Sequence, residues 1–556
     1  MVKVRSLSFP ASRALLLFAA LFVLFSFVWI RNAWLSDDAY ITLRTVYNTL
    51  HGLGPDFNPG ERVQSYTHPL WFLFLLVAHA LTGEAYYSTL ALSLLVSLAT
   101  LFLFAKYLAR TPQQALFGIG AMILSKAYID FSSSGLENPL SQLCLALFLI
   151  PFFQTNYSIR RLFWAALLAA LGTLARYDLI LLYLPPLALV MLQTWQHNPQ
   201  HRLRAIGALG AGFTPLVFWC SFALFYYGLI LPNTYYAKTP ANVPLFMWLN
   251  QGAKYFLNSL RLDPIALPLI VLALLLAIYA RSLSLISLTL GISLYLVYVL
   301  RIGGDFMSGR FFTVPLFTAL VILARVEPLG NSKYLIPLTL VMVLFSFFSP
   351  NPPLLSNETF GATTDPARIA LVEADRITDQ RAFYYHWTGL LQNLTGTANL
   401  SNITEVKDGV KFKSRKNRIL RTTGIGLRGY YAGPTTYVVD EMALADPFLA
   451  WMPRKNGWWI IGHFPRCVPP GYAKTLNAKL LNPRKINKNR NLIEDSELAA
   501  FYDQISLLNR AKLFDPNRIP AILNVNLGKY DYLRNQIHPC ENFYSGKPDP
   551  AITIAE

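Results

Sequence analysis

Long apolar runs recur through roughly the first 350 residues of this 556-residue chain, and they constrain its fold more than any other feature. The first run, residues 14–30, is long enough to cross a bilayer, and short polar segments separate it from the runs that follow. Hydrophobic residues make up 54% of the chain and charged residues only 14%, which excludes a soluble globular class for most of its length. The sequence therefore predicts a polytopic α-helical membrane protein.

Ten further apolar runs are candidate spans, so we expect about eleven transmembrane helices. They cover residues 86–104, 115–129, 140–153, 162–174, 179–192, 206–229, 265–279, 283–300, 312–323 and 334–348. Several are shorter than the roughly twenty residues that cross a bilayer. Because these runs also contain polar side chains, we expect them to be buried within a bundle.

One more apolar segment, residues 69–81, decides the orientation. If it crosses the membrane, Lys106 and Arg110 lie outside together with the later basic loops. If it lies in the outer interface, all the basic loops face the cytoplasm, as the positive-inside rule requires. The second assignment places the N-terminus inside and the segment after residue 348 outside. It explains the net charge of +18 by cytoplasmic loops and a basic exported tail, without invoking nucleic acid.

The chain is expected to form two domains. Residues 1–348 form the transmembrane domain, with a first outer loop at 31–85, and residues 349–556 follow a proline-rich linker and contain no further span. Short β-branched and aromatic runs at 436–439 and 458–461 predict strands, and helical patterning at 366–378 and 497–509 predicts helices. We therefore expect an exported mixed α/β domain. Cys467 and Cys540 both fall in it, and the sequence leaves open whether they are joined.

Two adjacent carboxylates, Asp37 and Asp38, follow the first span directly, at the water boundary. Neighbouring carboxylates repel, which raises the pKa of one of them, and such a group can take a proton near neutral pH. Tyr40 and Arg44 share a helical face with Asp37, so a short surface helix would direct all three at one volume. The alternative is a solvated connector that the aspartates cap.

Further polar motifs stand at the outer ends of later spans. Their charged and aromatic residues are Glu137, Arg176, Asp178, Tyr235, Lys238, Asp305 and Arg310, and His68 closes the first outer loop. If these loops converge, arginine and lysine side chains match a phosphate, whereas acids and aromatic rings match a sugar. An interfacial ion pair or a snorkelling anchor explains any single one equally well. Four motifs at one face favour a common site. His386 and His463 have no evident partner and are assigned structural roles.

In order and content these motifs resemble those of the GT-C glycosyltransferases, which use polyprenyl-phosphate sugars. Within that superfamily the chain is similar to the terminal β-(1→2) arabinofuranosyltransferase family of mycobacteria and its Gram-negative relatives. The segments that carry the resemblance are SDDAYITLR, QSYTHPLW, SSGLENPL, ARYD, PNTYYAK and GGDFMSGRFF, and residues 439–447 and 461–472 resemble that family's exported domain. The resemblance thus covers nearly the whole chain.

The resemblance implies a multi-pass enzyme of the bacterial cytoplasmic (inner) membrane that acts in cell-envelope biogenesis, with a periplasmic or extracytoplasmic C-terminal domain. Its partners would be a polyprenyl-phosphate sugar donor, a glycan or glycoconjugate acceptor and membrane lipid, with no nucleic acid. The implied sugar is D-arabinofuranose. Because some GT-C enzymes use a divalent cation and others do not, the metal site stays open.

The resemblance also implies roles for single residues. Asp37 or Asp38 would be the general base, with Asp37 preferred because it comes first after the span and Glu137 as the substitute. Arg44, Lys238 and Arg310 would hold the phosphate leaving group. The remaining substrate-binding residues would be Tyr40, His68, Arg176, Asp178, Tyr235 and Asp305, with Glu137 also able to orient the sugar.

Three rival functions differ in kind. An enzyme of the same class could use mannose or aminoarabinose instead of arabinofuranose. A polytopic sugar or lipid transporter would show charges at mid-membrane and an internal repeat, whereas the charges here cluster at one face. The C-terminal domain could instead be a binding module on an inert anchor, which the convergent motifs argue against.

Overall fold

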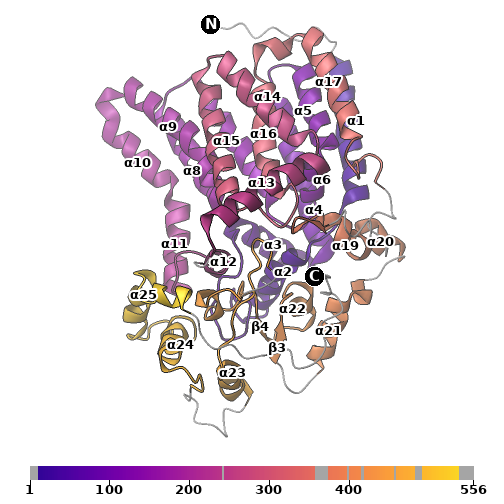
Figure 1. Cartoon of the computed structure of the whole chain (residues 1–556). Coiled ribbons are helices and arrows are strands. Elements are labelled where there is room, and N and C mark those ends of the chain that lie inside the picture. The colour runs from indigo at the N-terminus through magenta and orange to yellow at the C-terminus, as the bar shows by residue number, and fades with distance from the viewer. Residues whose placement is uncertain are drawn as a thin grey trace.

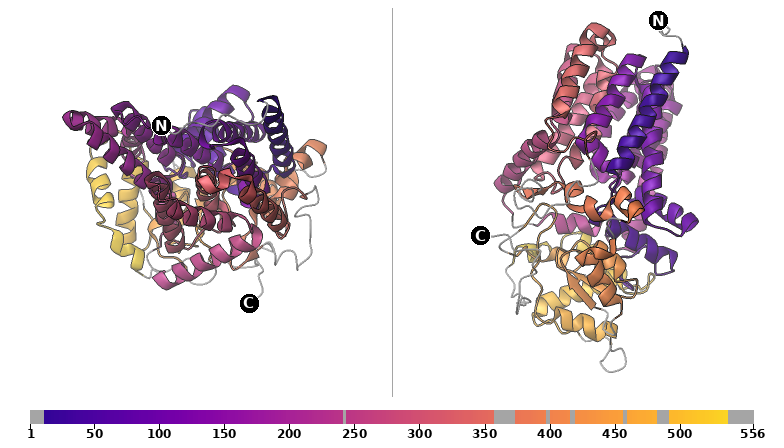
Figure 2. Two further views of the ribbon diagram at one scale, coloured as in Figure 1. Left: turned by 90° about the horizontal axis from the view of Figure 1, so that it is seen from above. Right: turned by 90° about the vertical axis from the view of Figure 1, so that its right-hand side faces the viewer.

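The computed structural model describes residues 11–240, 243–356, 373–396, 400–414, 419–455, 459–481 and 491–536. It consists of a bundle of long helices with a second, mostly helical part at one end (Figure 1). The start of α1 (Ala11–Asn32) lies at the far end of the bundle from this second part, which contains the elements after residue 373 (Figure 2). The expected division into two domains at residue 348 stays a prediction.

Each of the expected apolar runs is mostly helical. The bundle comprises α1, α4 (Tyr86–Leu103), α5 (Pro112–Leu124), α6 (Lys126–Phe131), α7 (Asn138–Phe152), α8 (Ile159–Ala175), α9 (Ile180–His197), α10 (Arg202–Gly212), α11 (Thr214–Tyr226), α14 (Ala266–Tyr279), α15 (Leu283–Arg301), α16 (Thr313–Leu323) and α17 (Ser332–Ser346). Within the described residues, three helices are long and apolar enough to span a membrane, or up to five if each bent pair counts as one span. The expected number of eleven spans is therefore not confirmed.

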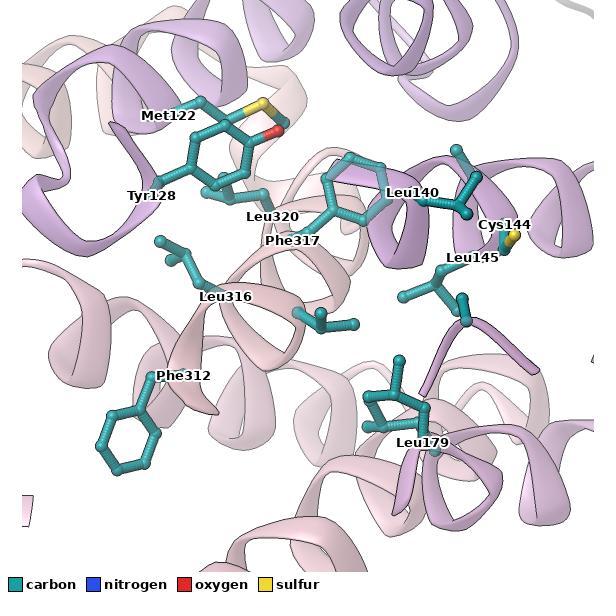
Figure 3. Packing of buried hydrophobic residues seen from close by; sticks show 14 of the residues in the cluster. Met122, Tyr128, Leu140, Cys144, Leu145, Leu179, Phe312, Leu316, Phe317 and Leu320 are labelled. Atoms are coloured by element: carbon teal, nitrogen blue, oxygen red, sulfur yellow. The ribbon is translucent and has the colours of Figure 1, made fainter. Parts of the chain in front are cut away.

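The short central helices explain this difference. Every residue of α16 is buried, so other helices surround this helix. Because α16 does not face lipid, it can be shorter than a helix that crosses the bilayer at the edge of the bundle. Its side chains pack with those of α5, α6 and α7 into the core drawn in Figure 3, which includes Met122, Tyr128, Leu140, Cys144, Leu145, Leu179, Phe312, Leu316, Phe317 and Leu320. Cys144 is a free buried thiol, as expected for a cysteine within a span.

Three helices lie where the bundle meets the second part. α2 (Asp37–Leu50) confirms the expected helix after the first span, and the Ser36 side chain caps it by accepting the Ala39 N–H. α3 (Pro69–Thr82) ends at Gly83 in the left-handed conformation and packs on α2 and α4. α13 (Leu245–Leu262) meets α14 at 105°, so it runs across the end of the bundle. The interfacial position of α3 stays a prediction.

The second part contains α19 (Gln380–Thr388), α20 (Leu390–Thr395), α21 (Thr404–Lys413), α22 (Leu427–Tyr431), α23 (Tyr472–Leu481), α24 (Ser496–Asn509) and α25 (Arg518–Asn526). β3 (Ile419–Thr422) pairs in parallel with β4 (Tyr437–Asp440), with Ile419 opposite Tyr437. Helices and short strands therefore mix, as the sequence predicted. The strand expected at 436–439 corresponds to β4, and the helix expected at 497–509 corresponds to α24.

The helix expected at 366–378 is wrong where the structure describes it. Residues 373–378 form a hairpin of β1 (Glu373–Ala374) and β2 (Ile377–Thr378), whose turn residues Asp375 and Arg376 have φ values of 56° and 65°. The backbone of Thr378 pairs with the bundle instead, donating to the Phe306 carbonyl at 2.7 Å and accepting the Ser308 N–H at 3.1 Å. These long-range bonds compete with helix formation, and local patterning does not reveal them.

The remaining expectations for the C-terminal part have mixed outcomes. Of the strand expected at 458–461, the described residues form only a bridge between Ile460 and His463. Cys467 takes part in a disulfide, and its expected partner Cys540 lies outside the described residues.

Candidate functional site

The two adjacent acids at the start of α2 have different surroundings. The Asp37 carboxylate accepts the Leu427 N–H at 2.7 Å, and a Cβ placed on Gly426 would lie 2.1 Å from the Asp37 carbonyl oxygen. Asp38 is partly buried, and within the described residues its carboxylate has no hydrogen bond or ion pair. The C-terminal part therefore holds Asp37 in place, whereas the Asp38 carboxylate is open to a ligand.

Burial raises the pKa of Asp37 to about 7. The Leu427 N–H opposes the rise, and the negative charge of Asp38 adds to it. A perturbed carboxyl pKa at this position agrees with the sequence expectation, but the main cause is desolvation rather than repulsion between neighbours.

Glu137 is the centre of a buried ion-pair network. Its carboxylate accepts from Arg310 Nη2 at 2.9 Å and lies 3.2 Å from His68 Nδ1, and the other ring nitrogen of His68 lies 2.8 Å from Thr42 Oγ1 on α2. Burial disfavours the charged form of Glu137, but Arg310, His68 and Arg176 together hold its pKa well below its usual range. Glu137 is thus an ionised, fully engaged carboxylate and a poor proton acceptor.

The same network extends through two arginines. Arg310 Nη1 lies 3.3 Å from Asp305, and Arg176 binds Asp178 with two donors at 2.7 and 2.8 Å. Arg176 also donates to the Tyr295 hydroxyl and lies 4.0 Å from Glu137. Three of the four late motifs and the histidine of the first loop therefore converge, as the sequence predicted.

The network does not carry a net positive charge. Two guanidinium groups face three carboxylates, so the charges at most balance even with His68 protonated. Arg310 Nε and Arg176 Nη1 are buried and make no hydrogen bond within the described residues, so each guanidinium group keeps one donor beside its carboxylate partners. The ion pairs of Arg176 and Arg310 fix the positions of the loops around them.

Lys238 is the cation that remains open. It ends α12 (Asn233–Lys238), is partly buried, and has no hydrogen bond or ion pair within the described part of the chain. The turn at Gly462 lies against its side chain, since a Cβ on this glycine would be 3.4 Å from Lys238 Cε. His463, which follows Gly462, packs its ring against Phe306, with ring centroids 4.5 Å apart.

His463 is the residue that the sequence analysis missed. Asp38, Lys238 and Asp305 all influence its titration, which places it among the open acid, the open cation and the paired network. The signal in the sequence was the Gly462-His463 pair in a segment between two aromatic runs, which is typical of a tight turn. Nothing local indicated that the turn faces the bundle.

Three expected substrate-binding residues lie elsewhere. Arg44 is buried and donates to the backbone carbonyls of Phe57, Gly429 and Thr436, so its guanidinium is occupied by the protein. Tyr40 is buried against Tyr430 and Tyr431, and Tyr235 is 48% exposed. The structure therefore gives Arg44 a role in joining α2 to the C-terminal part.

Within the described ranges, no group of three or more His, Cys, Asp or Glu side chains is placed to ligate a metal ion. The metal site that the sequence left open therefore has no candidate ligand set among these residues.

A half-open groove of about 340 Å³ lies beside these residues, between α13 and the β1–β2 hairpin. Gln251, Lys254, Asp375, Arg376 and Trp459 contribute to its lining. Trp459 belongs to an apolar cluster with Ile461, whose side chain packs on Gly303 of the loop that carries Asp305. Trp459 and Ile461 thus connect the lining of the groove with the loop that carries Asp305.

Comparison with known proteins gives sequence relatives but no matching family model. The chain is 28% identical over 439 residues to the terminal β-(1→2)-arabinofuranosyltransferase of Mycobacterium tuberculosis, which covers 68% of this chain and 66% of that protein. It is 28% identical over 342 residues to the enzyme of the same name from Corynebacterium glutamicum, which covers 53% of this chain and 48% of that protein. The chain thus spans about two thirds and about half of these relatives.

Among solved structures, the chain is similar to ArnT from Cupriavidus metallidurans. The apo structure has a TM-score of 0.47 at 15% identity and covers 84% of this chain and 91% of ArnT. The structure bound to undecaprenyl phosphate has a TM-score of 0.45 at 13% identity and covers 78% and 87%.

Proposed function

We propose that the chain is a membrane glycosyltransferase that transfers a sugar from a polyprenyl-phosphate donor to a glycan or glycoconjugate acceptor of the cell envelope. The proposed sugar is D-arabinofuranose, which the names of the two sequence relatives support. The observation that carries the proposal is that an open carboxylate, Asp38, and an open ammonium group, Lys238, both lie near His463 without contacting each other. Transfer from a phosphate ester needs one group of each kind.

The reaction assigns a task to each of the two. An acceptor hydroxyl attacks the anomeric carbon of the sugar and gives its proton to Asp38. The bond between that carbon and the phosphate oxygen breaks, its electron pair goes to the phosphate, and Lys238 offsets the developing negative charge. The buried network around Glu137 is already paired in the free protein, so it holds the surrounding loops without rearranging during the reaction.

Asp38 is the preferred base because its neighbour is occupied. Asp37 accepts the Leu427 N–H and packs against Gly426, whereas Asp38 has no donor among the described residues. This reverses the preference drawn from the sequence, which rested only on the order of the two residues. Asp37 is assigned to positioning of α2.

Replacing each acid by asparagine tests the assignment, since the amide keeps the shape but cannot accept the proton. The assay is transfer from synthetic polyprenyl-phosphate arabinofuranose to an arabinoside in detergent, with mannosyl and aminoarabinosyl donors in parallel. We expect Asp38→Asn to lower turnover by about 10²–10⁴-fold, the usual contribution of a general base, and Asp37→Asn to lower it much less. Full activity of the Asp38→Asn protein would reject Asp38 as the base. Absence of transfer from all three donors by the wild-type protein would reject the proposed function.

A further inference from the structure

His463 lies in a tight turn that is fixed from both sides. Its N–H donates to the Ile460 carbonyl at 2.9 Å, and the Ile460 N–H returns a bond to its carbonyl at 3.2 Å. Gly462 has φ of +80°, a left-handed backbone that favours glycine, and this brings the turn against Lys238. Arg466 joins the turn to α12 by donating to the carbonyls of Met452 and Ala237. The turn and Lys238 therefore keep a fixed relation to each other.

The imidazole of His463 is held in one orientation but has unused hydrogen-bonding capacity. Phe306 packs against it edge to face, at an interplanar angle of 82°. Its Nδ1 is fully buried and makes no hydrogen bond within the part of the chain that the structure describes. Native proteins pair nearly all such buried atoms with protein, water or a ligand, so this nitrogen is free to accept or donate a hydrogen bond to a bound group. The neighbouring Lys238 is partly buried, and its ammonium group makes no hydrogen bond or ion pair with the described residues.

The charged groups that face His463 come from three elements: Asp38 from α2, Lys238 from α12 and Asp305 from the loop after α15. Burial lowers the pKa of His463 below its ordinary value. Asp38, Asp305 and an interaction of the ring with the Ile461 backbone oppose the change, while Lys238 adds to it. The ring is therefore neutral at neutral pH and offers one N–H donor and one acceptor nitrogen.

We propose that His463 binds the phosphate of the lipid-linked donor together with Lys238, so that the C-terminal part supplies one wall of the donor site. This inference rests on the proposed function. Lys238 supplies the positive charge, and the His463 N–H supplies a directed hydrogen bond to a phosphate oxygen. When the sugar leaves, the phosphate gains a negative charge, and both interactions become stronger. His463 thus takes a binding role in place of the structural role expected from the sequence.

The test measures binding of farnesyl phosphate, a short polyprenyl phosphate without sugar, to the full-length protein in detergent. The variants are His463→Phe, His463→Gln, Lys238→Met and the double variant His463→Phe/Lys238→Met. The matched control is His386→Phe, because His386 lies on α19 in the same part of the chain, packs on Trp387 and is not among the groups that act on His463. Inorganic phosphate is titrated as a competitor, which separates recognition of the phosphate from recognition of the lipid.

We expect His463→Phe to weaken binding about 10–100-fold, the loss of one hydrogen bond to a charged group. His463→Gln, which keeps an N–H donor, should retain most of the affinity, and His386→Phe should bind like the wild type. The double variant should lose less than the product of the single losses, because both residues hold the same anion. Equal binding by wild type and His463→Phe would overturn the inference, as would a loss in His463→Phe that glutamine does not rescue. Failure of the wild type itself to bind farnesyl phosphate would instead overturn the proposed function.

Discussion

Arg44→Met should destabilise the attachment of the C-terminal part to α2. Arg44 is 2% exposed and donates to three backbone carbonyls, at 2.8 Å to Phe57, at 2.6 Å to Thr436, and to Gly429. The Phe57 carbonyl also accepts from Asn48 Nδ2 at 3.1 Å, so Arg44→Met removes the side-chain donor of two acceptors. Leaving a buried acceptor unpaired costs about 1–3 kcal/mol, so these two set an upper limit of roughly 6 kcal/mol. Removing the buried charge returns part of that cost. We therefore expect a net loss of about 3–5 kcal/mol, the range typical of a broken buried charge contact.

The assay follows tryptophan fluorescence during thermal unfolding, with farnesyl phosphate binding measured below the transition. Arg110→Met is the matched control, because Arg110 is half exposed and lies 4.0 Å from the exposed Glu327 at the other end of the bundle. We expect Arg44→Met to melt at a clearly lower temperature than the wild type and Arg110→Met to melt like it. If Arg44→Met melts like the wild type but loses the probe, Arg44 contacts phosphate, and the structural role assigned to it is wrong.

Two further predictions concern Asp37 and the topology. The folded pKa of Asp37, about 7, lies above its ordinary value of 3.8, so burial of this carboxyl costs stability as the pH rises from about 4 to 7 and costs a constant amount above that. At pH 8, Asp37→Asn should therefore raise the free energy of unfolding by up to about 4 kcal/mol, with a higher melting temperature. Near pH 4, the substitution should change both quantities little. Equal melting at both pH values would contradict this. If α3 lies in the outer interface and α4 is a span, Thr82→Cys should react with an impermeant thiol reagent in intact cells and Lys106→Cys should not. Labelling of Lys106→Cys but not of Thr82→Cys would show that α3 is itself a span and would contradict its interfacial position.

The sequence predicted which polar residues lie together better than the contacts that each of them makes. Each polar motif follows an apolar run, so the hydrophobic pattern alone places Glu137, Asp305 and Arg310 at one end of the bundle. Arg44 and Lys238 look equivalent in the sequence, as two cations in outer segments. Only tertiary contacts distinguish them, since three carbonyls occupy Arg44 and none of the described residues pairs with Lys238.

Long-range contacts also explain the two expectations about local structure that failed. The segment before Thr378 has a helical pattern, but pairing of the Thr378 backbone with Phe306 and Ser308 favours a hairpin there. His463 has no periodic pattern around it, because one left-handed glycine sets the direction of its turn. The spacing of apolar residues indicates which face of a helix is buried. The hairpin before Thr378 and the turn at His463 do not depend on such a face, so this spacing could not predict them.

The contacts of the C-terminal part with the bundle argue against an independent binding module on an inert anchor. Such a module would meet the bundle mainly through its linker. Instead, Leu427 binds Asp37, Thr378 binds the loop between Asp305 and Arg310, and His463 packs on Phe306. A fourth contact is the buried ion-pair group of Lys126 and Asp130 on α6 with Asp379 and Arg381. Because the desolvation that raises the Asp37 pKa arises at the interface with Gly426 and Leu427, the electrostatics of the acid pair depend on both parts of the chain.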